Sequence, residues 1–231
     1  MSDPRTLRIA AIRAALDVAA PDIAAVAPAG YSVPALIATI VRAITDESKL
    51  LHATDASFVA SAMRAASLGL RPDKRHGALV PRRVGRGDDE RTEVQFQPDW
   101  KGLVYAVRTL GAARHIYAHV VRAEDHYVVD LGTAPSVVHR PKTTGVPADA
   151  VAYYAVAILP DGTPDVEAMT IEQVQSHRAR YSPKGKYESP WDTAFDEMAR
   201  KTVVHRMLKR LALSADALGA VLDEYDTDPT P

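Results

Sequence analysis

The sequence predicts an α+β fold built as a single domain. Apolar residues recur at helical spacing in the opening third, short alternating segments fill the middle, and helical spacing returns near the end with many Lys and Arg residues. No repeat or linker divides the 231 residues, which are enough to bury a substantial core. We therefore expect one domain over residues 1–214, followed by an acidic and partly disordered tail over residues 215–231.

The N-terminal third is expected to form helices. Apolar positions over residues 5–27 follow a helical period that Pro21 interrupts, and Pro34 stands at a favourable first position for the next helix. Asp55 is the expected cap of a further helix, and Gly69 is expected to end that helix in a left-handed conformation.

The middle of the chain is expected to form a mostly antiparallel sheet around a central helix. Residues 78–80 and the alternating TEVQFQ segment predict two strands joined by the polar VGRGDDER tip. An apolar stripe after Pro98 predicts the central helix, which Gly111 terminates. Four more segments predict strands, and the last of them turns at PDG into a partner strand: RHIYAHVVR, DHYVVDLG, PSVVHRP and VAYYAVAILPDG.

A long basic helix is expected over residues 190–212. Pro190 suits its first turn, and Ser189 is the candidate cap.

The charged residues are distributed unevenly. The whole chain carries a net charge of −1, yet residues 64–108 carry +4, residues 177–210 carry +5 and residues 211–231 carry −5. Because a polyanion responds to the local field, two basic blocks are compatible with nucleic-acid binding. Solvated helix faces and a tail that aids solubility explain the same composition equally well.

The bulk composition excludes several classes of protein. With no Cys, the chain has no disulfide, thiol nucleophile or cysteine-metal site. It has no run of eighteen apolar residues, and its N-terminus lacks the apolar core of a secretory signal. We expect a cytoplasmic protein without a membrane span.

One enzyme site remains as an alternative, a Mg²⁺-dependent nuclease. Asp73, Asp99 and Lys101 have the residue types of a PD…DxK constellation, in which two acids hold the metal and a lysine orients the attacking water. Pro98 interrupts the strand that this motif requires, which argues against it. The chain also has no GxxxxGK[ST] loop and no GxSxG turn. We expect a protein that is not an enzyme and needs no cofactor.

Cations and aromatic residues occur together in the second basic block, as they do in single-strand binding sites. Trp191 and Phe195 can equally be core residues, and we expect Phe195 to be one. Lys101 is expected to contact phosphate at the start of the central helix, with Trp100 beside it and Asp99 as the cap. A plain capped helix with a solvent-facing lysine is the alternative there. The expected DNA contacts are Arg82, Lys101, Arg108, Arg178, Lys184, Lys186, Trp191, Arg200, Lys201, Arg206 and Lys209.

Several segments together resemble the RecT family of phage recombinases. They are SLGLRP, ALVPR, VQFQPDWKGLVYAVRTLG, VVRAEDHYVVDLG, VVHRP and SPW…DEMARKTVVHRMLKRLALS, in this order between about residues 30 and 214. The chain departs from the family at Trp100, where Tyr is usual, and at Ala212, where Pro is usual.

The resemblance implies a small bent sheet with helices and a protein that anneals complementary single strands of DNA without ATP. It implies an oligomeric ring or helical filament with the DNA in a basic groove. A cognate 5′–3′ exonuclease and a host single-strand-binding protein are the implied partners, in phage or prophage homologous recombination. A protein that coats single strands passively, without speeding their pairing, is the alternative.

Overall fold

The computed structural model describes residues 3–181 and 189–211 of the chain. It confirms the α+β class. The chain divides into two compact units, residues 1–110 and residues 111–231. Among the described residues the strands belong to three small antiparallel sheets, and no helix is long and apolar enough to cross a membrane. The expected tail lies outside the described residues, so its boundary stays a prediction.

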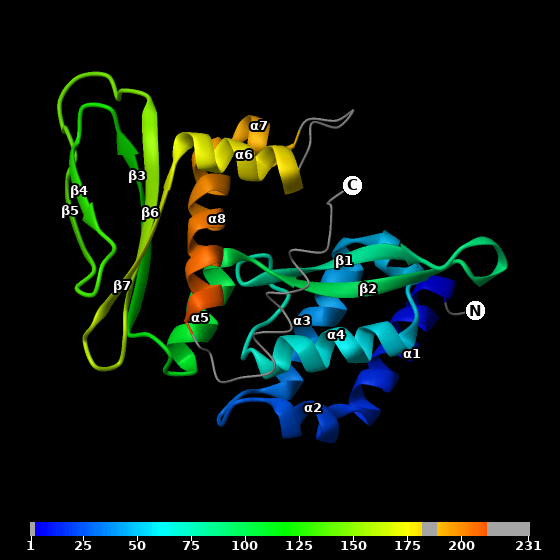
Figure 1. The fold of residues 1–231 in the computed structure, drawn as a ribbon. Coiled ribbons are helices and arrows are strands. Elements are labelled where there is room, and N and C mark those ends of the chain that lie inside the picture. Colours follow the sequence, from blue (N-terminus) through cyan, green and yellow to red (C-terminus); the bar gives the residue numbers. More distant parts are fainter. Residues whose placement is uncertain (1–2, 182–188, 212–231) are drawn as a thin grey trace. The chain divides into compact units, whose positions relative to one another are not determined.

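The first unit combines helices with a β-hairpin (Figure 1). The hairpin itself was predicted, but its first strand is longer than the expected residues 78–80, and Gly77 lies opposite Pro98 and Val84 opposite Arg91. The elements of the unit are α1 (Pro4–Val18), α2 (Ala20–Val26), α3 (Val33–Asp46), η1 (Ser48–His52), α4 (Asp55–Ser67), β1 (Gly77–Val84), η2 (Gly87–Asp89), β2 (Arg91–Pro98) and α5 (Trp100–Thr109).

Helix α4 begins one residue earlier than the sequence suggested. Thr54 is its cap, not Asp55, because the Thr54 hydroxyl accepts the N–H of Ser57 at 3.3 Å. Asp55 lies in the first turn, where a carboxylate still stabilises the helix by its interaction with the positive end of the helix dipole. Gly69 ends the helix as expected, with φ of +66° and its N–H donating to the Ala66 carbonyl at 2.8 Å.

Helix α4 also completes the hydrogen bonding of β2. Among the described strands β2 is paired with β1, and its other edge has one isolated parallel bridge, between Thr92 and Ala53. The rest of that edge needs different partners. The Ser61 hydroxyl donates to the Val94 carbonyl at 2.9 Å and accepts the Phe96 N–H at 3.1 Å. The Ser57 hydroxyl accepts the Val94 N–H at 3.0 Å. The hairpin is therefore attached to the helical core, where Phe58 is fully buried.

The second unit is built around a three-stranded antiparallel sheet in the order β3-β6-β7, with a separate hairpin of β4 and β5. All of these strands were predicted. The elements of the unit are β3 (His115–Arg122), β4 (His126–Asp130), β5 (Ser136–Arg140), β6 (Ala150–Ile158), β7 (Pro164–Thr170), α6 (Ile171–Tyr181), α7 (Pro190–Thr193) and α8 (Phe195–Arg210).

The central strand β6 is covered on both faces. Tyr153 points toward α8, where its hydroxyl donates to Asp196 at 2.5 Å. Tyr154 and Val156 point the other way and join a core cluster with residues of the β4–β5 hairpin. Figure 1 shows the hairpin and α8 on opposite sides of the sheet. In the second unit, α8 therefore packs on one face of the sheet and the β4–β5 hairpin packs on the other.

The C-terminal helical region differs from the expectation in two ways. Helix α6 was not predicted, and the expected continuous basic helix is divided into α7 and α8. Asp192 accepts the N–H of Ser189 at 2.9 Å, which places Ser189 at the start of α7 as expected. Ala194 has φ of −142° and ψ of 51°, so the helix restarts at Phe195. Residues 182–188, between α6 and α7, lie outside the described residues.

Candidate nucleic-acid interface

Helix α5 begins at the open end of the β1–β2 hairpin, directly after β2. The Asp99 carboxylate accepts the Lys101 N–H at 3.0 Å, which confirms Asp99 as the cap. The Asp99 N–H donates to the His76 carbonyl at 2.9 Å. The Lys101 ammonium lies 5.8 Å from the centre of the Trp100 ring, within the range of a cation–π contact. The turn thus places Lys101 at the positive end of a ten-residue helix.

One face of α5 exposes two cations and an aromatic ring. Lys101, Tyr105 and Arg108 are exposed, and their spacings of four and three residues place them on one side of the helix. We call these three residues the α5 stripe. The other side of the helix buries Leu103 and Val107. Within residues 3–181 and 189–211, no carboxylate pairs with Lys101 or Arg108, so both charges face solvent.

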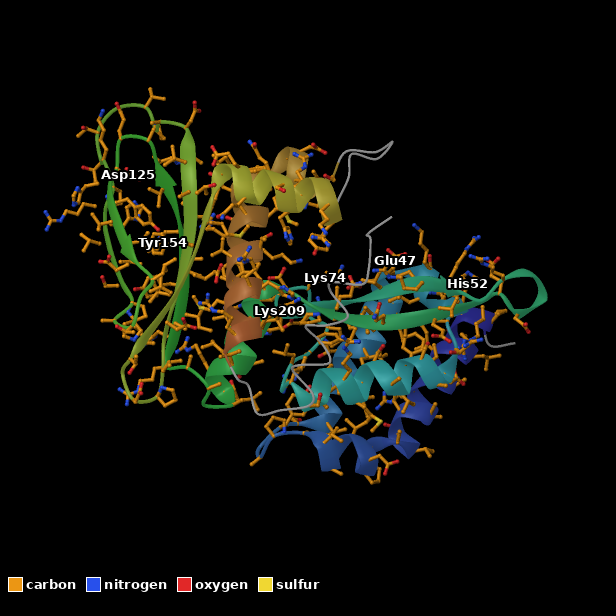
Figure 2. All side chains as sticks on the ribbon, viewed as in Figure 1. Glu47, His52, Lys74, Asp125, Tyr154 and Lys209 are labelled. Atoms are coloured by element: carbon orange, nitrogen blue, oxygen red, sulfur yellow. The ribbon has the colours of Figure 1, made fainter. Side chains whose placement is uncertain are left out.

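A basic turn over residues 71–76 meets the start of α5. Asp73 organises it by accepting the N–H groups of Arg75 at 2.9 Å and His76 at 2.7 Å, with the His76 Nδ1 at 2.9 Å. Burial opposes ionisation of Asp73, but these hydrogen bonds outweigh it and lower the pKa of the carboxyl. Lys74 has φ of +63°, an uncommon left-handed conformation. Lys74 and Arg75 are both exposed, and Figure 2 shows Lys74 at the base of the β1–β2 hairpin.

The sequence reasoning missed Lys74, Arg75 and Tyr105. The two cations belong to the first basic block, and Tyr105 follows Lys101 by one helical turn. A helical-spacing search outward from Lys101 finds the tyrosine. The proximity of the turn at residues 71–76 to α5 depends on the pairing of β1 with β2, which no local pattern reveals.

Two arginines of α8 form ion pairs with acids of β7: Arg206, which is an expected DNA contact, and Arg210, which is not. The Arg206 Nε lies 3.0 Å from a carboxylate oxygen of Glu167, and Arg210 pairs with both Glu167 and Asp165. Glu167 is 5% exposed. Because a buried carboxylate needs compensating charge, these arginines hold α8 against the sheet.

Arg178 and Arg200 are also paired. Arg178 binds the Asp192 carboxylate, and Arg200 binds Glu197 one turn earlier on α8. Trp191 is 6% exposed, and its ring centre lies 5.5 Å from that of Phe195. Trp191 is therefore packed as the core alternative describes.

The other expected contacts are less constrained by the structure. Arg82 lies on β1 opposite Glu93 and is partly exposed. Lys201 and Lys209 lie on α8, where each interacts with its surroundings. Lys184 and Lys186 lie outside the described residues.

The nuclease alternative finds no support in the geometry. Asp99 is the cap of α5 and Asp73 holds the basic turn, so both carboxylates serve main-chain N–H groups. In the part of the chain that the structure describes, no three His, Asp or Glu residues gather as a metal-binding group.

The α+β fold and the α5 stripe belong to a chain that is a member of the RecT family, whose family model matches residues 34–230. The predicted resemblance is confirmed. One similar protein is Protein RecT of Escherichia coli (strain K12), which is 32% identical over 174 residues. The matched region covers 74% of this chain and 63% of the relative, so the chain spans less than two thirds of that protein's length.

Proposed function

We propose that the protein binds single-stranded DNA and anneals complementary strands in phage-type homologous recombination. The observation that carries this proposal is the α5 stripe with the exposed Lys74 and Arg75, in a chain of the RecT family. Two exposed basic segments that meet at the end of one hairpin provide a track for a phosphate backbone.

The physical obstacle to annealing is repulsion between two polyanions. Lysine and arginine side chains that neutralise phosphates release counterions and reduce this repulsion. A grip on phosphates leaves the base edges free, so base pairing itself tests the sequence. Each stacking step of the product duplex contributes about 1.4 kcal/mol. Correct pairing therefore supplies the driving force, and no nucleotide hydrolysis is needed.

We further propose that copies of the chain assemble into a ring or helical filament. Assembly aligns successive α5 stripes into a groove and makes binding along the strand cooperative. The lack of a GxxxxGK[ST] loop in the sequence supports action without ATP. A 5′–3′ exonuclease that exposes single strands and a host single-strand-binding protein are the proposed partners, in the bacterial cytoplasm.

The test is a hybridisation assay with two complementary oligonucleotides, one carrying a fluorescence donor and the other an acceptor. The strands are mixed at low salt with and without protein, without nucleotide, and the duplex is counted after the protein is removed. We expect faster duplex formation with protein. Spontaneous hybridisation rates despite strand binding would indicate passive coating, and loss of labelled strand only with Mg²⁺ would revive the nuclease alternative.

A further inference from the structure

A small cavity of the first unit is not explained by phosphate binding. Its volume is about 250 Å³, and it is enclosed by the loop between α2 and α3, the basic turn and α5. Pockets for drug-sized ligands occupy about 300–1,000 Å³. This cavity is below that range, so its size suits a single small ring system.

Aromatic rings and a cation form its walls. The Arg71 guanidinium lies 5.6 Å from the centre of the Tyr31 ring. The Tyr105 and His76 ring centres are 5.0 Å apart, with their planes inclined at 46°. Tyr105 lines the cavity and is nevertheless 48% exposed. An accessible aromatic face beside cations is the feature that stacks nucleobases, and it accepts every base because each has a π-face.

The polar groups of the wall suit a neutral ligand with acceptor atoms. The Tyr31 hydroxyl donates to the Leu70 carbonyl, and burial raises the pKa of this phenol to about 12, so it stays neutral. Arg71 carries five N–H donors. Within the described residues it forms no ion pair. Its remaining donors are therefore available to ring nitrogens or carbonyl oxygens.

The charges decide which part of a nucleotide enters. Asp73 lines the cavity as a carboxylate: burial opposes its ionisation, but the hydrogen bonds that it accepts from His76 and Arg75 lower its pKa. The Asp73 carboxylate would repel a phosphate inside the cavity, because both are negatively charged. A neutral base would not be repelled. Phosphates left outside would meet the exposed Lys74 and Arg75 of the same turn and Lys101 of α5. The arrangement thus favours the base inside and the backbone outside.

We propose that this cavity takes one unstacked nucleobase of the bound strand. The inference rests on the proposed function for the source of the base, because a free nucleotide presents the same chemistry. A base held in this way fixes the position of the strand relative to the subunit without reading its sequence. Its neighbours stay available for pairing.

The experiment compares an ordinary short single strand with an abasic strand of the same length, and a strand carrying one 2-aminopurine. The variants are Tyr105→Ala, Tyr105→Phe and, as a matched exposed tyrosine that does not line the cavity, Tyr117→Ala. For the wild type we expect 2-aminopurine quenching and affinity for the ordinary strand roughly five- to a hundredfold above that for the abasic strand. Tyr105→Ala loses both effects, while Tyr105→Phe and Tyr117→Ala keep them.

A second measurement separates this inference from the proposed function. Saturation-transfer NMR with deoxyadenosine monophosphate reports whether base protons contact the protein. Contact that Tyr105→Ala abolishes, in a protein that binds no strand, would support the cavity and reject the DNA-binding proposal. A wild type that binds both strands equally, with Tyr105→Ala unchanged and no contact to the free base, would overturn the cavity proposal alone.

Discussion

A Cβ atom on residue 102 would lie 1.9 Å from the main-chain oxygen of His76. The contact is with backbone, so no side-chain rotation relieves it. The same His76 oxygen accepts the Asp99 N–H that anchors the start of α5. Gly102 is therefore required for space, and the fit between the basic turn and α5 depends on it.

We expect Gly102→Ala to destabilise the protein despite the better helix propensity of alanine. Alanine gains at most about 1 kcal/mol within a helix, whereas forced overlap in a packed site costs about 1–3 kcal/mol or more. Urea unfolding measures the difference. Gly132→Ala is the matched control, since nothing lies within 4 Å of its added Cβ. Equal stability of the two variants would show that the turn yields freely.

Ser61 supports β2 from the neighbouring helix, and its removal should be costly. Ser61→Ala leaves the Val94 carbonyl and the Phe96 N–H without their partner in a site where Ser61 is 4% exposed. The expected loss is about 1–3 kcal/mol in the free energy of unfolding. The control is Ser67→Ala, whose hydroxyl donates to the Arg64 carbonyl of its own helix at 2.9 Å, with an expected effect within about 0.5 kcal/mol. Similar losses for both would refute the bridging role.

Local signals explain which elements were predicted. Helix α5 has its cap, its apolar stripe and its terminating glycine within one short stretch of sequence, residues 99–111, so its bounds could be predicted. Helix α6 buries only Val174. Its mostly polar sequence, IEQVQSHRARY, therefore gives little amphipathic signal.

Contacts between residues far apart in sequence explain why some features of the candidate site could not be predicted. Lys101 could be selected because its surroundings are set by its own turn. Arg206 of α8 could not be distinguished from it by sequence, because its acidic partner, Glu167, lies far away in sequence on strand β7. A charge pattern gives the sign of a side chain's charge, but only the fold shows whether that side chain is already paired with an acid.

Asp125 predicts an acid-dependent loss of stability in the second unit. It accepts the N–H groups of Arg122 and Lys142, each at 2.8 Å, with the His139 Nε2 at 3.0 Å. The Arg122 N–H is the largest cause, followed by the His139 and Lys142 bonds, and the pKa of Asp125 falls to about 2. Figure 2 labels Asp125 and Tyr154, the two groups on either side of the His139 ring.

The sign follows from the lowered pKa. A carboxyl whose pKa is about 2 in the folded protein, below its ordinary value of 3.8, stabilises the fold above pH 4. That contribution is lost as the pH falls from about 4 to about 2. We expect Asp125→Asn to have a lower urea midpoint than the wild type at pH 6, with the gap closing in this window. A gap that stayed constant down to pH 2 would contradict the hydrogen-bonded carboxylate.

Lys101 and Arg206 differ in their ion pairing, and we expect them to have different roles, one in DNA binding and the other in stability. Lys101 has no carboxylate partner among the described residues, whereas Arg206 is paired with the buried Glu167. Lys101→Met should weaken binding to all single strands alike and reduce the salt slope of the logarithm of the binding constant by about 0.7, one phosphate contact. It should leave the unfolding free energy nearly unchanged.

Arg206→Met should do the opposite, because it leaves Glu167 with one partner fewer. We expect a loss of about 1–3 kcal/mol in stability and an unchanged salt slope. Fluorescence anisotropy across a salt series and urea unfolding give both quantities for each variant. Should Arg206→Met lower the slope as much as Lys101→Met, the pair with Glu167 must open when DNA binds, and α8 would join the α5 stripe as a phosphate contact.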